Sequence, residues 1–506
     1  MIDLFLADSS HAAISGNFLG SQNFVNGAAW IGSHATAVAG AALSQDTTRR
    51  GVAFDAGWWT AQTTNRGSIT DMRTQTIAAE TLARGLGDLG GNPAEVLTLS
   101  IGLAGTDAAI DQWSLGLDHL VAAHGTTVVV AAGNDGPAIS SFPGPPGTAF
   151  NILSVGATGG TGAAISEDYS QIAPYSSRGP ASDGRGKPDI VAPGSLLELP
   201  ALGGGWAVGS GTSFATPLVA GGAALLVDMG RDRGFDTDAL VIKSVLMNSA
   251  DKLAGWSHTA AAPLDPKFGA GQMNLESAYY QYDAGEHGPG SVGTIGWDHG
   301  SLLGTTDNIY DIDLNLPAGS ELTATLVWNR AVSSSTTDIE TTVYSTSPLA
   351  NLDLFLYELG DPATAIASSV STIDNVEHLL FSLPTAGNYA LAVRGIGGIV
   401  DPLPYALAWS IAVPDISLPG DYNGDGIVNA ADFVVWRATD GSPAGYGTWR
   451  ANFGATSGIG SSATTDSFDT LSASVPEPAC LAILLAGAGA VLLYSVYGRS
   501  ASRKRS

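Results

Sequence analysis

The residue with the clearest potential for chemistry is Ser213, which follows the glycine-rich turn 209–211 and precedes an apolar stretch with helical spacing. A hydroxyl attacks a carbonyl efficiently only when a base removes its proton, and the free N–H groups at a helix N-terminus can bind the oxyanion that forms. The position therefore suits nucleophilic catalysis. An isolated serine at a helix start is more often an N-cap, so the motifs elsewhere in the chain must decide between the two interpretations.

The elements around Ser213 alternate between two patterns over residues 1–283. Apolar runs rich in β-branched residues predict buried strands at 96–101, 126–132 and 152–157. Helical spacing predicts helices at 107–123, 213–229 and 237–248. This alternation predicts an α/β fold, an open parallel sheet with helices on both faces.

Three segments of this region together resemble the subtilase family of subtilisin-like serine peptidases. Segment 211–217 (Gly-Thr-Ser-Phe-Ala-Thr-Pro) resembles the nucleophile motif. Segment 33–40 resembles the histidine motif, with Ala35 and Ala37 in place of the usual glycine and second histidine. Segment 128–137 resembles the strand whose asparagine completes the family's oxyanion hole. Segments 175–180 and 187–194 are also typical of the family, without a role in the chemistry.

The resemblance implies a role for each of these residues. His34 is the expected general base, and Asn134 is the expected oxyanion donor beside the backbone N–H of Ser213. Outside this context, such a histidine would be a structural residue and such an asparagine would cap a turn.

The acid of the triad is the open assignment, because the family has it ahead of the histidine, at the end of the first strand. Residues 4–7 have the pattern of a buried strand end, and Asp8-Ser9-Ser10 then resembles the family's aspartate, hydroxyl residue and glycine, with Ser10 at the glycine position. We therefore expect Asp8 to complete the triad. Asp3 is one alternative. An acid upstream of Met1 is another, because the chain begins without an export signal and looks truncated. The last alternative is that the triad has no acid.

The implied reaction is hydrolysis of peptide bonds in polypeptide substrates, with no cofactor in the chemistry. Ser213 attacks the carbonyl, His34 carries the proton to the leaving amine, and Asp8 orients His34. Segment 100–102 resembles the edge along which an extended substrate pairs; its residues are Ser100, Ile101 and Gly102. The alternative is a catalytically impaired subtilase scaffold that serves as a surface binding or adhesion protein. An intact acid beside His34 separates the two.

The second half of the chain changes to short alternating strands after a glycine-rich stretch at 285–296. Strands are expected at 309–314, 322–328, 352–357 and 389–393, which predicts a β-sandwich accessory domain over residues 286–413. Asp298 and His299 could form a metal or structural site there, but we expect them to be solvated surface residues.

A small module at 420–454 contains oxygen-bearing side chains at the spacing of an EF-hand calcium loop. The expected ligands, including one main-chain carbonyl, are Asp421, Asn423, Asp425, Ile427, Asn429 and Asp432. The loop resembles a dockerin repeat, and calcium is its expected structural metal. A second repeat is reduced to 446–454, which lacks a ligand loop, so we expect a stiffened spacer rather than a cohesin-binding module.

The end of the chain has three parts after a flexible stalk at 458–474. Segment 475–479 contains Pro-Glu-Pro, residues 479–496 are apolar, and a basic end follows. Eighteen apolar residues can span a bilayer, with the basic end toward the cytoplasm. The order resembles the PEP-CTERM sorting signal and implies an exosortase-type sorting enzyme as partner. The expected location is the cell envelope or surface of a bacterium, with an anchor in the membrane through this helix.

Composition excludes two other classes of function. The formal charge of −26 disfavours binding to nucleic acid, because both partners would be negative. The one cysteine, Cys480, lies in the apolar tail, so the chain can form no disulfide within itself and a cysteine peptidase centre is excluded.

Overall fold

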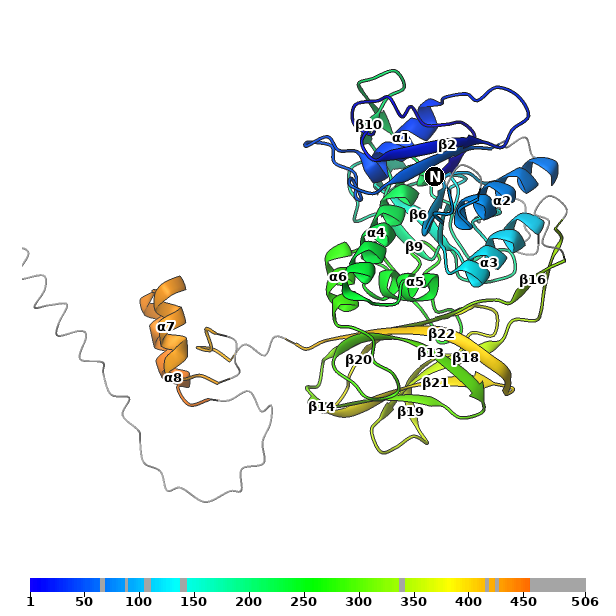
Figure 1. The fold of residues 1–506 in the computed structure, drawn as a ribbon. Coiled ribbons are helices and arrows are strands. Elements are labelled where there is room, and N and C mark those ends of the chain that lie inside the picture. Colours follow the sequence, from blue (N-terminus) through cyan, green and yellow to red (C-terminus); the bar gives the residue numbers. More distant parts are fainter. Residues whose placement is uncertain are drawn as a thin grey trace, which may run out of the picture. The chain divides into compact units, whose positions relative to one another are not determined.

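The computed structural model describes residues 1–63, 69–86, 90–103, 111–136, 143–335, 342–414, 418–423 and 427–455. The chain divides into two compact units, Met1–Pro414 and Asp415–Ser506. The first unit contains an α/β region and an all-β region (Figure 1).

Seven parallel strands form the sheet of the α/β region, in the order β2-β3-β1-β4-β5-β6-β9. This confirms the predicted parallel α/β fold. The strand bounds are β1 Ile2–Asp3, β2 Phe18–Asn23, β3 Trp58–Gln62, β4 Val96–Leu99, β5 Thr127–Ala131, β6 Leu153–Thr158 and β9 Ile190–Pro193. Two short antiparallel pairs accompany the sheet: β7 Gly160–Thr161 with β8 Ala164–Ile165, and β10 Leu197–Pro200 with β11 Trp206–Gly209.

Helices cover both faces of this sheet, with α2 and α3 on one side and α4, α5 and α6 on the other (Figure 1). The reason is visible in β5, where successive side chains point to opposite faces. Val128 and Val130 pack in the core under α2 and α3, whereas Val129 packs in the core under α4 and α5. The helix bounds are α1 Ser33–Leu43, α2 Ile69–Ala83, α3 Gln112–His124, α4 Thr212–Arg233, α5 Ala239–Asn248 and α6 Leu275–Asp283.

Two sheets form the all-β region, which we call the two-sheet region (residues 290–412). Their orders are β12-β14-β21-β18-β19 and β13-β22-β15-β20, and all pairs except β12 with β14 are antiparallel. The strand bounds are β12 Gly290–Ser291, β13 Ile295–Gly304, β14 Asn308–Leu316, β15 Glu321–Trp328, β18 Asn351–Glu358, β19 Ala365–Ser369, β20 Val376–Ser382, β21 Gly387–Ile396 and β22 Ile399–Ala412. A separate pair, β16 Val332–Ser334 and β17 Tyr344–Thr346, completes the region.

The two sheets share one core, in which Leu354 and Leu391 of one sheet pack with Leu326 and Leu407 of the other. The four-stranded sheet also faces the α/β region, because Val327 and Ala406 belong to the core under α4 and α5. The two regions of the first unit are therefore joined by continuous apolar packing.

Asp298 and His299 differ from the expectation of a solvated surface. Asp298 is buried and accepts a hydrogen bond from the Tyr310 hydroxyl, while His299 Nδ1 lies 2.6 Å from Asp236 Oδ2. The sequence pattern reveals neither partner: Tyr310 lies 12 residues from Asp298 on the next strand, and Asp236 lies 63 residues from His299.

The second unit is described up to residue 455 and contains α7 Ala430–Thr439 and α8 Pro443–Asn452. The rings of Phe433, Trp436, Tyr446 and Trp449 pack between these helices. The predicted stalk from 458, the sorting tail and the 479–496 helix lie outside the described residues. Among the described residues, α4 alone has the length and composition of a membrane span, and it is mostly buried against the sheet.

Candidate active site

The nucleophile candidate Ser213 is the second residue of α4, next to the turn that ends β11. The Ser213 hydroxyl donates a hydrogen bond to the Ser100 carbonyl at 3.3 Å, and the Ser100 hydroxyl donates to the Ser213 carbonyl at 2.7 Å. Gly211 N–H donates to the Gly194 carbonyl at 2.8 Å, which fixes the turn before the helix. The start of α4 is thus held against the ends of β4 and β9.

His34 lies in the first turn of α1 and contacts Asp3 at the end of β1. The two atoms joined are His34 Nδ1 and Asp3 Oδ2, 2.8 Å apart. Asp3 is almost fully buried, and its other oxygen, Oδ1, accepts the Leu4 N–H at 2.7 Å. Burial disfavours the His34 cation, but the hydrogen bond and the negative charge of Asp3 outweigh burial, so the pKa of His34 is raised.

The structure corrects the expectation that Asp8 faces His34. Asp8 Oδ1 accepts from the N–H and hydroxyl of Ser10, and Oδ2 accepts from Gly203 N–H at 3.1 Å. The Ser10 hydrogen bond is the main cause of the lowered pKa of Asp8. Asp8 therefore closes a turn instead of contacting the imidazole.

The physical reason is the length of β1. Ile2 pairs with Ala61 of β3 and with Leu99 of β4, and β1 ends at Asp3. Asp3 is then level with Ser100, the residue after β4, at the edge of the sheet where the carboxyl ends of parallel strands meet. The apolar residues 4–7, expected to form the strand end, lie beyond the sheet.

Asn134 follows β5 at the same edge. Its Oδ1 accepts from the Thr212 N–H at 2.8 Å and from the Thr212 hydroxyl at 3.0 Å. The Asn134 amide oxygen therefore accepts two hydrogen bonds from Thr212, and Nδ2 is the donor end of the amide group. Sequence reasoning missed this contribution of Thr212, although a helix-start N–H directly before Ser213 was a signal for it.

The family-type segments 175–180 and 187–194 support these loops. Gly136 N–H donates to the Tyr175 carbonyl at 2.8 Å, and Ser177 N–H donates to the Gly133 carbonyl at 3.0 Å. The Tyr175 hydroxyl donates to the Gly194 carbonyl at 2.7 Å. These hydrogen bonds hold the turn at 133–136, which contains Asn134.

A cleft of about 350 Å³ brings the side chains of His34, Asn134 and Ser213 together. Its described lining consists of Asp3, Leu4, Phe5, His34, Ser100, Ile101, Gly102, Leu103, Ala131, Ala132, Gly133, Asn134, Asp135, Gly144, Thr212 and Ser213. The structure thus places His34, Asn134, Ser213 and the 100–102 edge in one cleft, and the carboxylate that contacts His34 there is that of Asp3.

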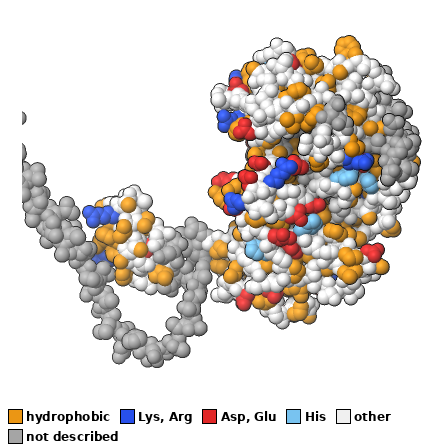
Figure 2. Space-filling view, in the orientation of Figure 1, with side chains coloured by type: hydrophobic (Ala, Val, Ile, Leu, Met, Phe, Trp, Pro, Cys, Tyr) orange, Lys and Arg blue, Asp and Glu red, His pale blue; other side chains and the backbone are white. Residues whose placement is uncertain are grey.

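On the face drawn in Figure 2, Lys and Arg side chains lie among Asp and Glu side chains.

Two of the predicted calcium ligands, Asp421 and Asp432, have side chains in contact in the described part of the second unit. Asp432 is buried, and its carboxylate accepts the N–H groups of Tyr422, Asn423 and Asn429. Asn429 Oδ1 accepts the Ala431 N–H and caps α7. Asp425 lies outside the described residues, and no group of three or more acidic, His or Cys side chains among those described could hold a metal ion.

The cleft lies at the carboxyl edge of an open parallel sheet. It contains the carboxylate of Asp3, the imidazole of His34, the hydroxyl of Ser213 and the amide of Asn134. This combination of groups is that of a serine-hydrolase type of site. The sequence model of the subtilase family matches residues 8–271, just over half of the chain. The chain belongs to the subtilase family, a family of serine endopeptidases.

Curated relatives share this part of the chain. Pyrolysin of Pyrococcus furiosus is 35% identical over 212 residues, which cover 37% of this chain and 15% of pyrolysin. Serine protease AprX of Bacillus subtilis is 36% identical over 169 residues, or 30% of this chain and 35% of AprX. The thermophilic serine proteinase of Bacillus sp. is 29% identical over 262 residues, or 49% of this chain and 55% of that protein. The chain thus matches only part of the length of each of these relatives.

Two solved structures are also similar to part of the chain. The self-cleaved protease domain of PatA is 24% identical, with a TM-score of 0.43, and the match covers 56% of this chain and 96% of that domain. The prenylagaramide maturation protease PagA is 24% identical with a TM-score of 0.43, and the match covers 55% of this chain and 91% of PagA.

Proposed function

We propose that the protein is an active serine endopeptidase that uses Asp3, His34 and Ser213 as its triad. The observation that carries this proposal is the 2.8 Å contact between buried Asp3 and His34 in the cleft that also contains Ser213. An inactive scaffold would be expected to lack an acid at this place, so the contact favours the enzyme over the binding-protein alternative.

Catalysis begins when the Ser213 hydroxyl leaves the Ser100 carbonyl and turns toward His34. His34 Nδ1–H remains on Asp3, so its Nε2 accepts the serine proton as Ser213 attacks the peptide carbonyl. The same proton then passes to the leaving amine, and water hydrolyses the acyl-enzyme by the reverse path. Asp3 keeps the imidazole in the required tautomer and stabilises its cation.

The oxyanion of each tetrahedral intermediate is bound by the Ser213 N–H and the Asn134 Nδ2 donors. Thr212 fixes the Asn134 amide oxygen, so its amide group is oriented before substrate arrives, which is the condition for strong electrostatic stabilisation. An extended substrate pairs with the main chain of residues 100–102.

The test is labelling of the full chain with a fluorophosphonate probe, together with hydrolysis of an unstructured protein substrate. Wild type should be labelled and active, and Ser213→Ala should be neither. A folded wild type that takes up no probe and cleaves no substrate would overturn the proposal.

We further propose that the two-sheet region is a β-sandwich accessory domain of the peptidase. The shared core of its two sheets and its continuous packing against the α/β region support this assignment. Limited proteolysis should release no separate fragment at the junction near residue 290 while the unit is folded.

For the second unit and the tail, the sequence pattern supports three proposals: calcium binding at 421–432, export, and sorting through 475–506. Asp432 accepts three backbone N–H groups, so a calcium ion bound to its carboxylate should change these contacts and the helicity of the unit; luminescence of terbium in the place of calcium tests whether the loop binds a metal ion. Cell fractionation with and without residues 475–506 tests envelope retention. Retention that is unchanged by the deletion would contradict the sorting proposal.

A further inference from the structure

One wall of the cleft is a segment whose far end is held by the two-sheet region. Gly144 lines the cleft, and the Pro145 carbonyl accepts the Leu103 N–H at 2.9 Å, which ties this wall to the neighbouring 100–102 edge, where we propose that substrate pairs. From there, residues 144–152, which we call the wall segment, run to the start of β6. Any shift of the wall segment therefore moves one side of the cleft.

Asn151 joins the wall segment to Arg330 by a two-way contact. Asn151 Nδ2 donates to the Arg330 carbonyl at 3.0 Å, and Arg330 N–H donates to Asn151 Oδ1 at 2.8 Å. Asn375, also of the two-sheet region, donates from Nδ2 to the Phe150 carbonyl at 3.2 Å and to the Trp328 carbonyl at 2.7 Å. Two consecutive residues of the wall segment are thus bonded to residues 179 and 225 positions later.

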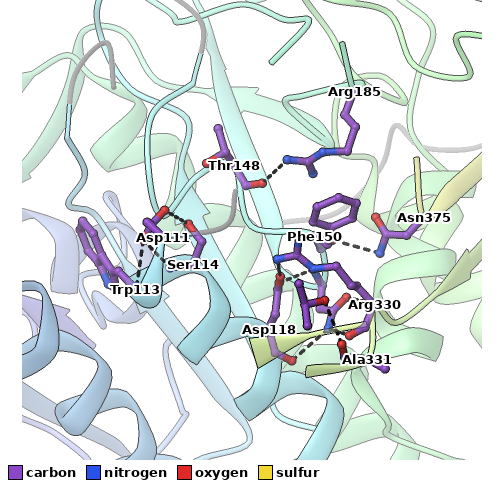
Figure 3. A network of polar contacts seen from close by, with 12 residues as sticks. Asp111, Trp113, Ser114, Asp118, Thr148, Phe150, Arg185, Arg330, Ala331 and Asn375 are labelled. Atoms are coloured by element: carbon purple, nitrogen blue, oxygen red, sulfur yellow. Dashed lines mark hydrogen bonds and ion pairs between the residues drawn. The ribbon is translucent and has the colours of Figure 1, made fainter. Parts of the chain in front are cut away.

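The side chain of Phe150 lies between two guanidinium groups (Figure 3). Arg185 and Arg330 place their Cζ atoms 3.6 Å and 3.9 Å from the ring centroid. Arg330 also forms an ion pair with Asp118 of α3 at 2.6 Å, and both side chains are buried. Because Asp118 Oδ1 accepts the Asn151 N–H at 2.7 Å, one carboxylate joins α3, the wall segment and the two-sheet region.

The two-sheet region also holds the start of α3. Gln112 Nε2 donates to the Tyr344 carbonyl at 2.9 Å, and Tyr344 N–H donates to Gln112 Oε1 at 2.8 Å. Gln112 is the first residue of α3, the helix that follows the substrate-pairing edge along the chain. The wall segment and the start of α3 are consequently both attached to the two-sheet region.

We propose that Arg330 and Asn375 are positioning residues for substrate binding, which act through Asn151 and Phe150 to fix the cleft wall at Gly144. This inference rests on the proposed peptidase function. Their contacts lie outside the triad and the oxyanion donors, so they influence the binding of substrate and transition state alike. Loss of such uniform binding raises KM and leaves kcat nearly unchanged.

The test compares kcat and KM of the full chain on a series of short peptide anilides that differ in the side chain before the cleaved bond. Arg330→Met and Asn375→Ala should each raise KM about fivefold or more for the preferred peptide and keep kcat within about twofold. The difference in kcat/KM between the preferred peptide and the other peptides of the series should become smaller. The control is Arg394→Met, which breaks another arginine–aspartate pair of the two-sheet region, with Asp307, away from the cleft wall. It should leave both constants unchanged.

A purely structural role would lower the unfolding midpoint without changing KM well below that temperature, and this result would overturn the inference. Arg330→Met leaves Asp118 buried without its partner and can unfold the chain. The double variant Asp118→Asn/Arg330→Met removes both charges, and Asn375→Ala removes none. If these two fold and keep the wild-type KM, the inference is wrong. If the peptidase proposal itself fails, the wild type takes up no fluorophosphonate, which distinguishes that failure from a failure of the positioning inference.

Discussion

Replacement of Asp3 by Asn tests the assignment of the triad most directly, because the structure predicts which tautomer His34 then adopts. Leu4 N–H donates to Asp3 Oδ1 and needs an acceptor there. In the variant, the amide oxygen must stay at Leu4, and the amide NH₂ group then faces His34 Nδ1. His34 is forced to carry its proton on Nε2, the atom that must accept the proton of Ser213.

The expected loss in kcat is about 10⁴-fold, as for the same change in other serine peptidases. This corresponds to about 5 kcal/mol of transition-state stabilisation. Asp8→Asn is the matched control, with the same change five residues later. Asp8 bonds Ser10 and Gly203, so its replacement should alter kcat by less than about threefold and cost about 1 kcal/mol of stability.

The pH dependence gives a second measurement on the same variants. His34 must be neutral to accept the proton, so kcat/KM rises with pH through the pKa of His34, which Asp3 raises. Asp3→Asn removes that charge and should move the acid limb to lower pH, while Asp8→Asn should leave it in place. The assignment is refuted if Asp3→Asn stays within tenfold of wild type and Asp8→Asn loses a thousandfold.

Three further predictions concern the oxyanion donor and two buried groups of the two-sheet region. Asn134→Leu should lower kcat about 10²–10³-fold with little change in KM, measured with the same anilides. Burial raises the pKa of Glu377 to about 9, against hydrogen bonds from Ser369 and Ser371. Between the ordinary glutamate pKa of 4.5 and about 9, Glu377 is protonated in the folded chain and ionised in the unfolded chain. The free energy of unfolding therefore falls as pH rises from 4.5 toward 9. Glu377→Gln should remove this slope and stabilise the unit by about 3 kcal/mol at pH 7 in urea unfolding. Burial lowers the pKa of His378, with the charges of Lys252 and His258 as further causes. Its contribution to stability is present above pH 6.5 and is lost as pH falls below it. His378→Gln should therefore gain stability relative to wild type as pH falls from 7 to 5, measured as the difference between the two unfolding midpoints.

The sequence predicted the positions of the strands and helices around the cleft closely, because their apolar runs are set by local burial on both faces of the sheet. The run expected at 126–132 is β5 at Thr127–Ala131, and the helix expected at 213–229 is α4 at Thr212–Arg233. Ser213 lies at the start of such an element and Asn134 lies three residues after the end of another, whereas His34 lies at the start of α1, for which no helix was predicted. Their convergence follows from the parallel order of the strands.

The carboxylate that contacts His34 was predicted wrongly, as Asp8 instead of Asp3, because apolar character does not determine where a strand ends. Residues 4–7 are apolar enough for a strand, yet β3 and β4 stop at Gln62 and Leu99, and β1 can pair no farther than its neighbours extend. The end of a short strand is set by its partners, which lie about 60 and 100 residues later. Neither hydrophobic period nor local motif contains that information.

The same limit applies to the contacts that hold the cleft wall. Arg330 and Asp118 are 212 residues apart, in regions that the sequence pattern separates into two domains. Each would be expected at the surface of its own domain, since a buried charge is costly unless it is paired. The pair is buried only because the four-stranded sheet packs against the α/β region and carries Arg330 to α3. The boundary predicted from sequence is thus a place where polar groups of both regions meet, and it lies directly behind one wall of the cleft.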